Sequence, residues 1–202
     1  GVSGFQVHFS SQEIFTPGDS LNALIAMNPA ALKTNLADLD AGGALIVNED
    51  AFTKKDLEKA GYAASPLDDD SLDGYTLFKV PMTTLTRGAV EGLGLSMKEA
   101  DRCRNFFAMG LIYWLYGREM TPTLRFIEAK FGSKPDVAEA NRKALNAGWN
   151  YGETTDAFVS NYEVAPAKLP PGEYKNMMGN QALAWGLVAA AKSSDKDLFY
   201  GT

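Results

Sequence analysis

The sequence predicts an α/β fold of three layers, in which a mostly parallel, Rossmann-like sheet is flanked by helices and followed by a helical second half. Three observations lead to this prediction. Short apolar runs of strand length alternate with helical segments in the first half. Apolar residues recur at helical spacing in the second half. Prolines and glycines fall between these segments, where they interrupt regular structure.

The first half is expected to contain four strands. Residues 5–9 alternate apolar and polar side chains, as in a strand buried on one face, and residues 16–19 then supply a turn. Residues 23–27 and 44–48 are continuous apolar runs, which are typical of buried strands. Residues 75–80 resemble a further strand.

Two helices are expected between these strands. The first spans residues 30–39 and ends before a Gly-Gly pair, with Asn28 as its N-cap and Pro29 in its first turn. The second is the polar helix of residues 53–59. The acidic residues 68–70 predict a solvated loop rather than a calcium site, which needs ligands at spaced positions.

The second half is expected to be helical. Ser96 and Glu99 form a capping box, and the helix that they open is expected to reach Gly117. Two shorter helices should follow, each with a proline near its first turn, and end around Gly132 and Gly148. The helix that Ser96 and Glu99 open carries a wide apolar stripe that must be covered by other elements. The stripe consists of Cys103, Phe106, Phe107, Gly110, Leu111, Trp114 and Leu115.

The polar residues 150–155 are expected to break the helical pattern, as a turn or a docking surface. The proline-rich residues 165–172 are the best linker candidate, and a small-residue helix over residues 180–192 and the start of a strand at residues 198–200 follow. We therefore expect a domain over residues 1–164, a linker over residues 165–176 and the start of a second domain over residues 177–202.

The composition excludes several classes of protein. With 46% hydrophobic and 22% charged residues, the chain is an ordinary globular protein. Its formal net charge of −6 and the absence of a Lys/Arg run argue against nucleic-acid binding. Because no stretch reaches the roughly 18 apolar residues that span a bilayer and no export signal is visible, we expect a cytoplasmic protein without membrane contact.

The reactive side chains favour structural roles over catalysis. His8, the single histidine, falls on the polar side of an expected strand, and Cys103, the single cysteine, lies on the apolar stripe. One cysteine rules out an internal disulfide, a four-thiolate zinc site and an iron–sulfur cluster ligated by this chain alone. The sequence lacks the glycine fingerprints of dinucleotide and phosphate loops. We expect no catalytic residue and no metal ligand in this chain.

A candidate ligand site lies at the carboxyl ends of the expected strands, where open α/β sheets bind their ligands. This strand-end rim comprises Asn28, Pro29, Ala30, Asn48 and Lys54. Helix amides that follow Asn28 are suited to a phosphate or a carboxylate. The alternative is that Asn28 only caps its own helix and that Asn48 only makes a turn.

Six segments carry a family resemblance: residues 4–9, 27–32, 50–55, 98–102, 150–155 and 179–184. Together they resemble the alpha subunits of 2-oxoglutarate:ferredoxin oxidoreductases, in the family of 2-oxoacid:acceptor oxidoreductases, over almost the whole chain. The resemblance implies a gamma-type domain, a Pro-Pro-Gly linker at residues 170–172 and the first helix and strand of a pyrimidine-binding domain for thiamine diphosphate. Asn22 departs from the family, because relatives commonly have Asp there.

The resemblance also implies a reaction, the oxidative decarboxylation of 2-oxoglutarate or a related 2-oxoacid with coenzyme A to acyl-CoA and reduced ferredoxin. The implied cofactors of the intact complex are thiamine diphosphate, Mg²⁺ and an iron–sulfur cluster, none of them bound by this chain alone. The implied partners are a thiamine-binding beta subunit and ferredoxin.

For this chain the resemblance implies a role in assembly, contact with coenzyme A at the rim and no activity in isolation. Such a chain should expose apolar surface. Two alternatives stay open: a non-catalytic module that binds a nucleotide or coenzyme A, and a stand-alone Rossmann-like oxidoreductase of carbonyl compounds.

Overall fold

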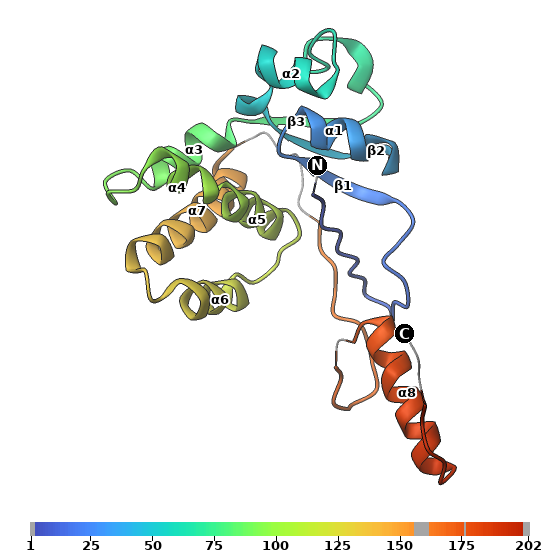
Figure 1. The fold of residues 1–202 in the computed structure, drawn as a ribbon. Helices are drawn as coiled ribbons and strands as arrows, with labels where there is room; N and C mark the ends of the chain where they lie inside the picture. The colour runs from blue at the N-terminus through green and yellow to red at the C-terminus, as the bar shows by residue number, and fades with distance from the viewer. Residues whose placement is uncertain (1–2, 156–161, 176, 200–202) are drawn as a thin grey trace. The chain divides into compact units, whose positions relative to one another are not determined.

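The computed structural model describes residues 3–155, 162–175 and 177–199 (Figure 1). The chain forms two compact units, Gly1–Ala167 and Lys168–Thr202. The first unit holds the sheet and helices α1 to α7, and the second holds helix α8.

Three parallel strands form the sheet of the first unit, in the order β1-β2-β3. They are β1 (Leu21–Ala26), β2 (Leu39–Asn48) and β3 (Thr76–Val80). Each follows from an apolar run of the sequence, so the strands predicted at residues 23–27, 44–48 and 75–80 are confirmed. Because the strands run in the same direction, their carboxyl ends meet at one edge of the sheet.

Helices cover both faces of the sheet. They are α1 (Pro29–Asn35), α2 (Lys54–Ala60), α3 (Met82–Ala89), α4 (Met97–Arg102), α5 (Arg104–Leu115), α6 (Thr121–Phe131) and α7 (Pro135–Thr154), with short 3₁₀ turns η1 (Leu36–Asp38), η2 (Glu49–Ala51) and η3 (Asp70–Leu72). In Figure 1, α1 and α2 lie on one side of the sheet and α5 lies on the other.

Alternation along the strands produces this layering, because successive side chains point to opposite faces. Leu45 packs with Leu32 of α1 on one face, and Ile46 packs with Phe107 and Leu111 of α5 on the other. Two apolar cores therefore sandwich the sheet. The α/β fold with a parallel sheet between helices is confirmed.

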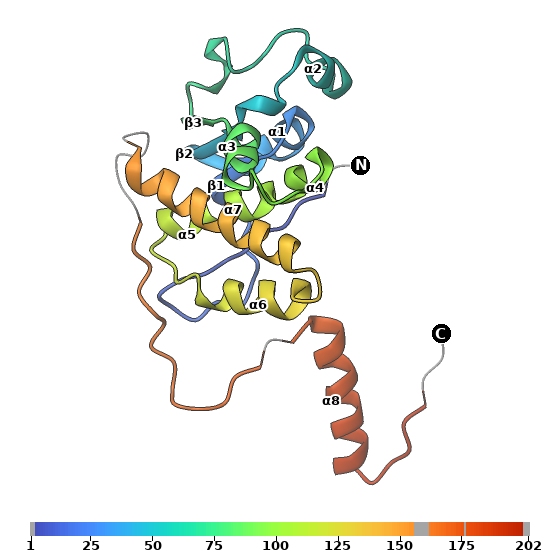
Figure 2. The ribbon, with the colours of Figure 1, turned by 90° about the vertical axis from the view of Figure 1, so that its left-hand side faces the viewer.

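Helix α5 lies directly against α7 (Figure 2). Two glycines make the close approach possible. A Cβ atom at Gly110 would lie 1.9 Å from the carbonyl oxygen of Leu145, and one at Gly148 would lie 1.9 Å from the carbonyl oxygen of Phe107. The backbones of the two helices therefore fill the space that a side chain would need.

The capping box at the start of α4 is confirmed, since Ser96 N–H donates to Glu99 Oε2 at 3.0 Å and Glu99 N–H donates to Ser96 Oγ at 3.4 Å. The prediction that this helix continues to Gly117 was wrong. It ends at Arg102, and α5 begins after Cys103. The amide of Cys103 bonds to the carbonyl of Ala100, three residues back, which tightens the turn and redirects the chain.

The strand predicted at residues 5–9 does not form. Side chains hold this segment instead: Gln6 Nε2 donates to the carbonyl oxygen of Pro17 at 2.9 Å, and His8 Nδ1 lies 2.8 Å from the carbonyl oxygen of Thr16. Phe5 is 93% exposed. Alternation alone gave the wrong prediction because a strand also needs a neighbouring strand for its backbone hydrogen bonds.

The helix predicted over residues 30–39 ends earlier than expected. It stops at Asn35, and Leu39 already pairs with Leu21 of β1. The Gly42–Gly43 pair lies inside β2 rather than beyond a helix. Gly42 has φ +77° and donates its N–H to the carbonyl of Gly74 at 2.7 Å, so the pair shapes an irregular strand.

The break predicted at residues 150–155 was also wrong, because α7 passes Gly148 and ends at Thr154. The glycines of α7 allow close packing against α5 and do not end the helix. A Cβ atom at Gly152 would lie 2.5 Å from the Trp114 ring, and Trp114 Nε1 donates to Glu153 Oε2 at 2.7 Å. Tertiary contacts with α5 thus continue the helix through the polar segment.

The second unit contains α8 (Gly179–Ser193), which confirms the helix predicted over residues 180–192. Within the second unit, Leu183, Trp185 and Leu187 of this helix are exposed. The predicted strand at residues 198–200 is wrong for Leu198 and Phe199, which have no strand partner among residues 177–199, and its last residue lies outside the described residues. None of the described helices is long and apolar enough to cross a membrane.

Candidate functional site

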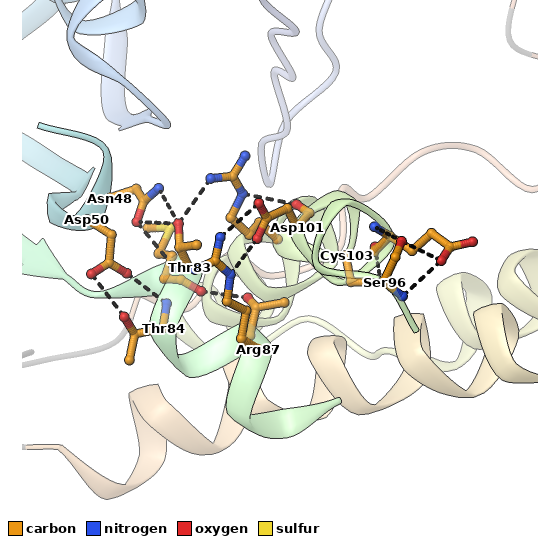
Figure 3. Close-up of polar contacts among 12 residues, drawn as sticks. Asn48, Asp50, Thr83, Thr84, Arg87, Ser96, Asp101 and Cys103 are labelled. Carbon is orange, nitrogen blue, oxygen red and sulfur yellow. Dashed lines mark hydrogen bonds and ion pairs between the residues drawn. The ribbon is translucent and has the colours of Figure 1, made fainter. Parts of the chain in front are cut away.

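A buried amide connects the carboxyl ends of the strands (Figure 3). Asn48, the last residue of β2, is fully buried. Its Nδ2 donates to the carbonyl oxygen of Met27 at 3.4 Å and to Thr83 Oγ1 at 3.1 Å, and its Oδ1 accepts the N–H of Thr83 at 3.3 Å. One side chain therefore joins the end of β1, the end of β2 and the start of α3.

The same edge of the sheet caps α3. Its N-cap residue, Pro81, provides no side-chain hydrogen bond for the first amides of the helix. Asn48 accepts the amide of Thr83, and Asp50 accepts the N–H of Thr84 at 2.8 Å and its hydroxyl at 3.1 Å. Residues that follow β2 therefore satisfy amides that a helix leaves unpaired at its start, and they fix α3 at the rim.

Asn28 is the N-cap of α1, as the sequence predicts. Its Oδ1 accepts the N–H of Ala31 at 2.9 Å, and Pro29 is the first helical residue. The side chain of Asn28 is exposed, whereas Pro29 is buried and Ala30 is half-buried. Among the described residues, none accepts a hydrogen bond from Asn28 Nδ2.

An open cleft of about 1970 Å³ lies beside these residues in the first unit, and Asn28, Pro29 and Ala30 line it. The other two candidate residues do not. Asn48 is buried behind the rim, and Lys54 is exposed at the start of α2, where Lys59 of the same helix lines the cleft. The structure thus brings three of the five predicted residues together on one wall.

Sequence reasoning missed Arg104, which lines the same cleft from the first turn of α5. Its Nη1 donates to Thr83 Oγ1 at 3.0 Å and its Nε donates to the carbonyl oxygen of Asp101 at 3.0 Å. The sequence could have indicated Thr83, because it follows the third strand closely, as Asn28 follows the first strand and as Asn48 ends the second. Arg104 was not, because its position depends on the helix break at Cys103.

Two arginines near the rim differ in their partners. Arg87 makes a bidentate ion pair with Asp101, with Nε and Nη2 at 2.7 and 3.0 Å from the two carboxylate oxygens. These hydrogen bonds hold the pKa of Asp101 below its usual range. Arg104 forms no ion pair with any carboxylate of the described residues. Its charge still contributes to the lowered pKa of the Asp101 carboxyl, so Asp101 is near both arginines but pairs directly with Arg87.

Of the two reactive side chains, Cys103 is enclosed and His8 lines the cleft. Cys103 is 2% exposed, and burial raises the pKa of its thiol. His8 is exposed and bound to the backbone at Thr16. Among the described residues, no group of three or more His, Cys, Asp or Glu side chains is arranged to hold a metal ion.

Cys103 is expected to react with an aromatic disulfide reagent roughly 100-fold more slowly in the folded chain than in urea, because the thiol is buried and protonated at neutral pH. The thiol of the unfolded chain, with a pKa of about 8.5, ionises at a lower pH than the buried thiol of the folded chain. The free energy of unfolding should therefore fall as the pH rises above this value. A spectrophotometric thiol assay checks the rate. Equal rates in buffer and in urea would contradict the buried position.

Comparison with known proteins assigns the family. The model of the pyruvate ferredoxin/flavodoxin oxidoreductase family matches residues 1–151. The chain belongs to this family. The resemblance found in the sequence is thereby confirmed, and the matched residues contain the sheet, the rim and helices α1 to α6.

One curated protein and one solved structure are similar to this chain. The 2-oxoglutarate oxidoreductase subunit KorA of Mycobacterium tuberculosis is 52% identical over 202 residues, which are 100% of this chain and 31% of that protein. The chain thus spans less than a third of the length of this relative. A solved structure of 2-oxoglutarate:ferredoxin oxidoreductase from Magnetococcus marinus, with 2-oxoglutarate, coenzyme A and succinyl-CoA bound, matches with a TM-score of 0.56 and 18% identity.

The solved structure covers 78% of this chain and 24% of its own chain, and at this identity it supports the fold alone. The residues of this family member do not fit an iron–sulfur cluster, because its single cysteine is buried in the core. Nor do the described residues provide a cluster of carboxylates for Mg²⁺.

Proposed function

We propose that the chain is part of the alpha subunit of a 2-oxoacid:ferredoxin oxidoreductase that acts on 2-oxoglutarate or a related 2-oxoacid. The observation that carries this proposal is the 52% identity to KorA, a 2-oxoglutarate oxidoreductase subunit, over all 202 residues. The aligned residues run from the sheet through α8, so the similarity includes the order of these elements.

In the proposed reaction, the bond between C1 and C2 of the 2-oxoacid breaks and C1 leaves as CO₂. The acyl carbon forms a thioester with coenzyme A, and the two electrons released pass to ferredoxin. Thiamine diphosphate, bound with Mg²⁺, supplies the stabilisation of negative charge at C2, and an iron–sulfur cluster carries the electrons. A thiamine-binding beta subunit and ferredoxin are the proposed partners.

This chain contributes assembly surfaces and a ligand contact. We assign residues 1–164 to a gamma-type domain, residues 165–176 to a linker and residues 177–202 to the start of the pyrimidine-binding domain. The exposed apolar side chains of α8 support a role in assembly, because apolar patches of this kind mark surfaces that other parts of a complex cover.

The rim is the proposed contact with coenzyme A. Asn28 presents an amide donor to the cleft, and Pro29 and Ala30 line the same wall. Asn48 holds the rim in shape from behind, and Lys54 adds a positive charge at the start of α2. The size of the cleft supports a large ligand, since common small-molecule pockets are about 300–1,000 Å³.

Replacing Asn28 by alanine is expected to weaken coenzyme A binding about fivefold to tenfold in calorimetric titrations, because one hydrogen bond to the ligand is lost. Asn28→Ser is the matched control for the helix cap. Serine caps a helix as well as asparagine does but lacks the amide donor, so it should weaken binding like alanine while the thermal stability stays near that of the wild type.

Parallel titrations with a nicotinamide dinucleotide separate the alternatives. Saturable binding of coenzyme A that depends on Asn28 supports the rim contact. In the assembled complex, Asn28→Ala should then raise the KM for coenzyme A and leave the KM for the 2-oxoacid unchanged. Binding of neither ligand would leave this chain as an assembly element. Preference for the dinucleotide would contradict the proposed function and favour a nucleotide-dependent carbonyl oxidoreductase.

A further inference from the structure

Arg104 has three features of an anion-binding residue. It lines the cleft from the start of α5. Its guanidinium is held in place by the hydroxyl of Thr83 and the carbonyl of Asp101, both at 3.0 Å. No carboxylate of the described residues pairs with it. An oriented cation that has no direct ion pair and lies beside an open cleft is suited to an oxyanion, because the guanidinium fork matches phosphate and carboxylate geometry.

The hydrogen bonds of Arg104 leave most of its donors available. A guanidinium carries five N–H groups, and the described contacts use one on Nε and one on Nη1. The Thr83 hydroxyl that accepts one of them is itself hydrogen-bonded to the buried amide of Asn48. The arginine is therefore fixed by the strand ends, and a ligand meets donors whose orientation is already set.

Charge along the cleft favours one end of it for an anion. Asp19, Asp38 and Asp40 line the cleft next to the amino ends of β1 and β2, so they lie at the opposite edge of the sheet from the rim. The Asn28 amide lines the cleft at the carboxyl ends, as Arg104 does. Asp56 and Glu163 also line the cleft, and Asp56 is paired with Lys59 at 3.7 Å. An anionic group placed at Arg104 avoids the three aspartates at the opposite edge of the sheet and meets a cation.

We propose that Arg104 binds a phosphate group of coenzyme A in this cleft. The inference rests on the proposed function for the identity of the ligand, and it adds the residue and the chemical group of the contact. A carboxylate of the 2-oxoacid has the same oxyanion chemistry. The open cleft of about 1970 Å³ has room for the larger ligand, and the titrations below separate the two.

Calorimetric titration of the 202-residue chain tests the proposal with four probes: coenzyme A, adenosine 3′,5′-bisphosphate, pantetheine and 2-oxoglutarate. Arg104→Gln should weaken binding of coenzyme A and of the bisphosphate about 10-fold to 100-fold, since charge-assisted hydrogen bonds are lost. Binding of pantetheine, which has no phosphate, should stay unchanged. Wild-type affinity for the bisphosphate should also fall as salt is added.

The matched control is Arg102→Gln, which removes the same charge from an exposed position two residues away that does not line the cleft. It should leave all four affinities unchanged. Arg104→Lys keeps the charge without the planar fork, so it should fold with the Thr83 contact weakened and bind with intermediate affinity. Thermal unfolding of each variant separates loss of the fold from loss of the contact.

Each outcome decides the proposal. Equal coenzyme A affinity in Arg104→Gln and the wild type overturns the role of Arg104 and leaves the proposed function standing. Binding of 2-oxoglutarate that depends on Arg104, with no effect on coenzyme A, overturns the phosphate assignment. Absence of coenzyme A binding to the wild-type chain overturns the rim contact and the role of Arg104 together.

Discussion

Gly110→Ala is expected to destabilise the chain by about 3 kcal/mol or more, which is the upper end of the range for overpacked cores. The added Cβ atom would lie 1.9 Å from the carbonyl oxygen of Leu145 in the neighbouring helix. The clash is with backbone, so no side-chain rotation relieves it, and α5 and α7 must move apart. Urea unfolding followed by circular dichroism measures the loss. Gly148→Ala, against Phe107, should have a similar effect.

The control for this prediction is Gly88→Ala in α3, where a Cβ atom meets nothing within 4 Å. Alanine favours helix over glycine, so this variant should be more stable than the wild type by about 0.5–1 kcal/mol. The two substitutions are chemically identical, and their opposite signs follow only from the packing of α5 on α7. A stabilised Gly110→Ala variant would contradict the close approach of these helices.

Asn48→Ala is expected to reduce the free energy of unfolding by about 2–4 kcal/mol, because it leaves buried polar groups without partners and opens a cavity. The amide and hydroxyl of Thr83 and the carbonyl of Met27 each lose a hydrogen bond. Chemical denaturation measures the change. Since Asn48 is fully buried, the effect should be on stability first and on ligand affinity only through the shape of the rim.

Asn150→Ala, at an exposed position of α7, is the control and should change stability by no more than about 0.5 kcal/mol. If Asn48→Ala were as stable as this control, the network at the strand ends would have no structural role. A loss of coenzyme A affinity at unchanged stability would instead show that Asn48 touches the ligand directly, as the bare sequence pattern allows.

The sequence alone determined the helices and strands that are stabilised by residues close to one another in the chain. Strands β1 and β2 follow from continuous apolar runs and β3 from its strand-like residues, and the starts of α1 and α4 follow from Asn28 and from the Ser96–Glu99 capping box. In each case the stabilising groups lie within a few residues of one another. The sequence also predicted that the sheet is parallel, because a helix between two successive strands lets the second strand run in the same direction as the first.

Tertiary structure decided the features that depend on distant partners. Residues 5–9 alternate as a strand does, yet they have no strand beside them, and Gly148 resembles a helix stop but packs against α5. The apolar stripe predicted a continuous helix, yet the turn at Cys103 breaks it and places Arg104 at the cleft. Local signals cannot distinguish these cases, because the deciding contacts join residues far apart in the chain.

The candidate site divides in the same way. The rule that ligands bind beyond the carboxyl ends of strands found Asn28, Pro29 and Ala30, which share one wall of the cleft. It did not separate Asn48, which is buried, from residues that face a ligand, and it did not find Arg104. Sequence position determines which residues follow a strand, whereas burial and side-chain direction arise only when the helices pack on the sheet.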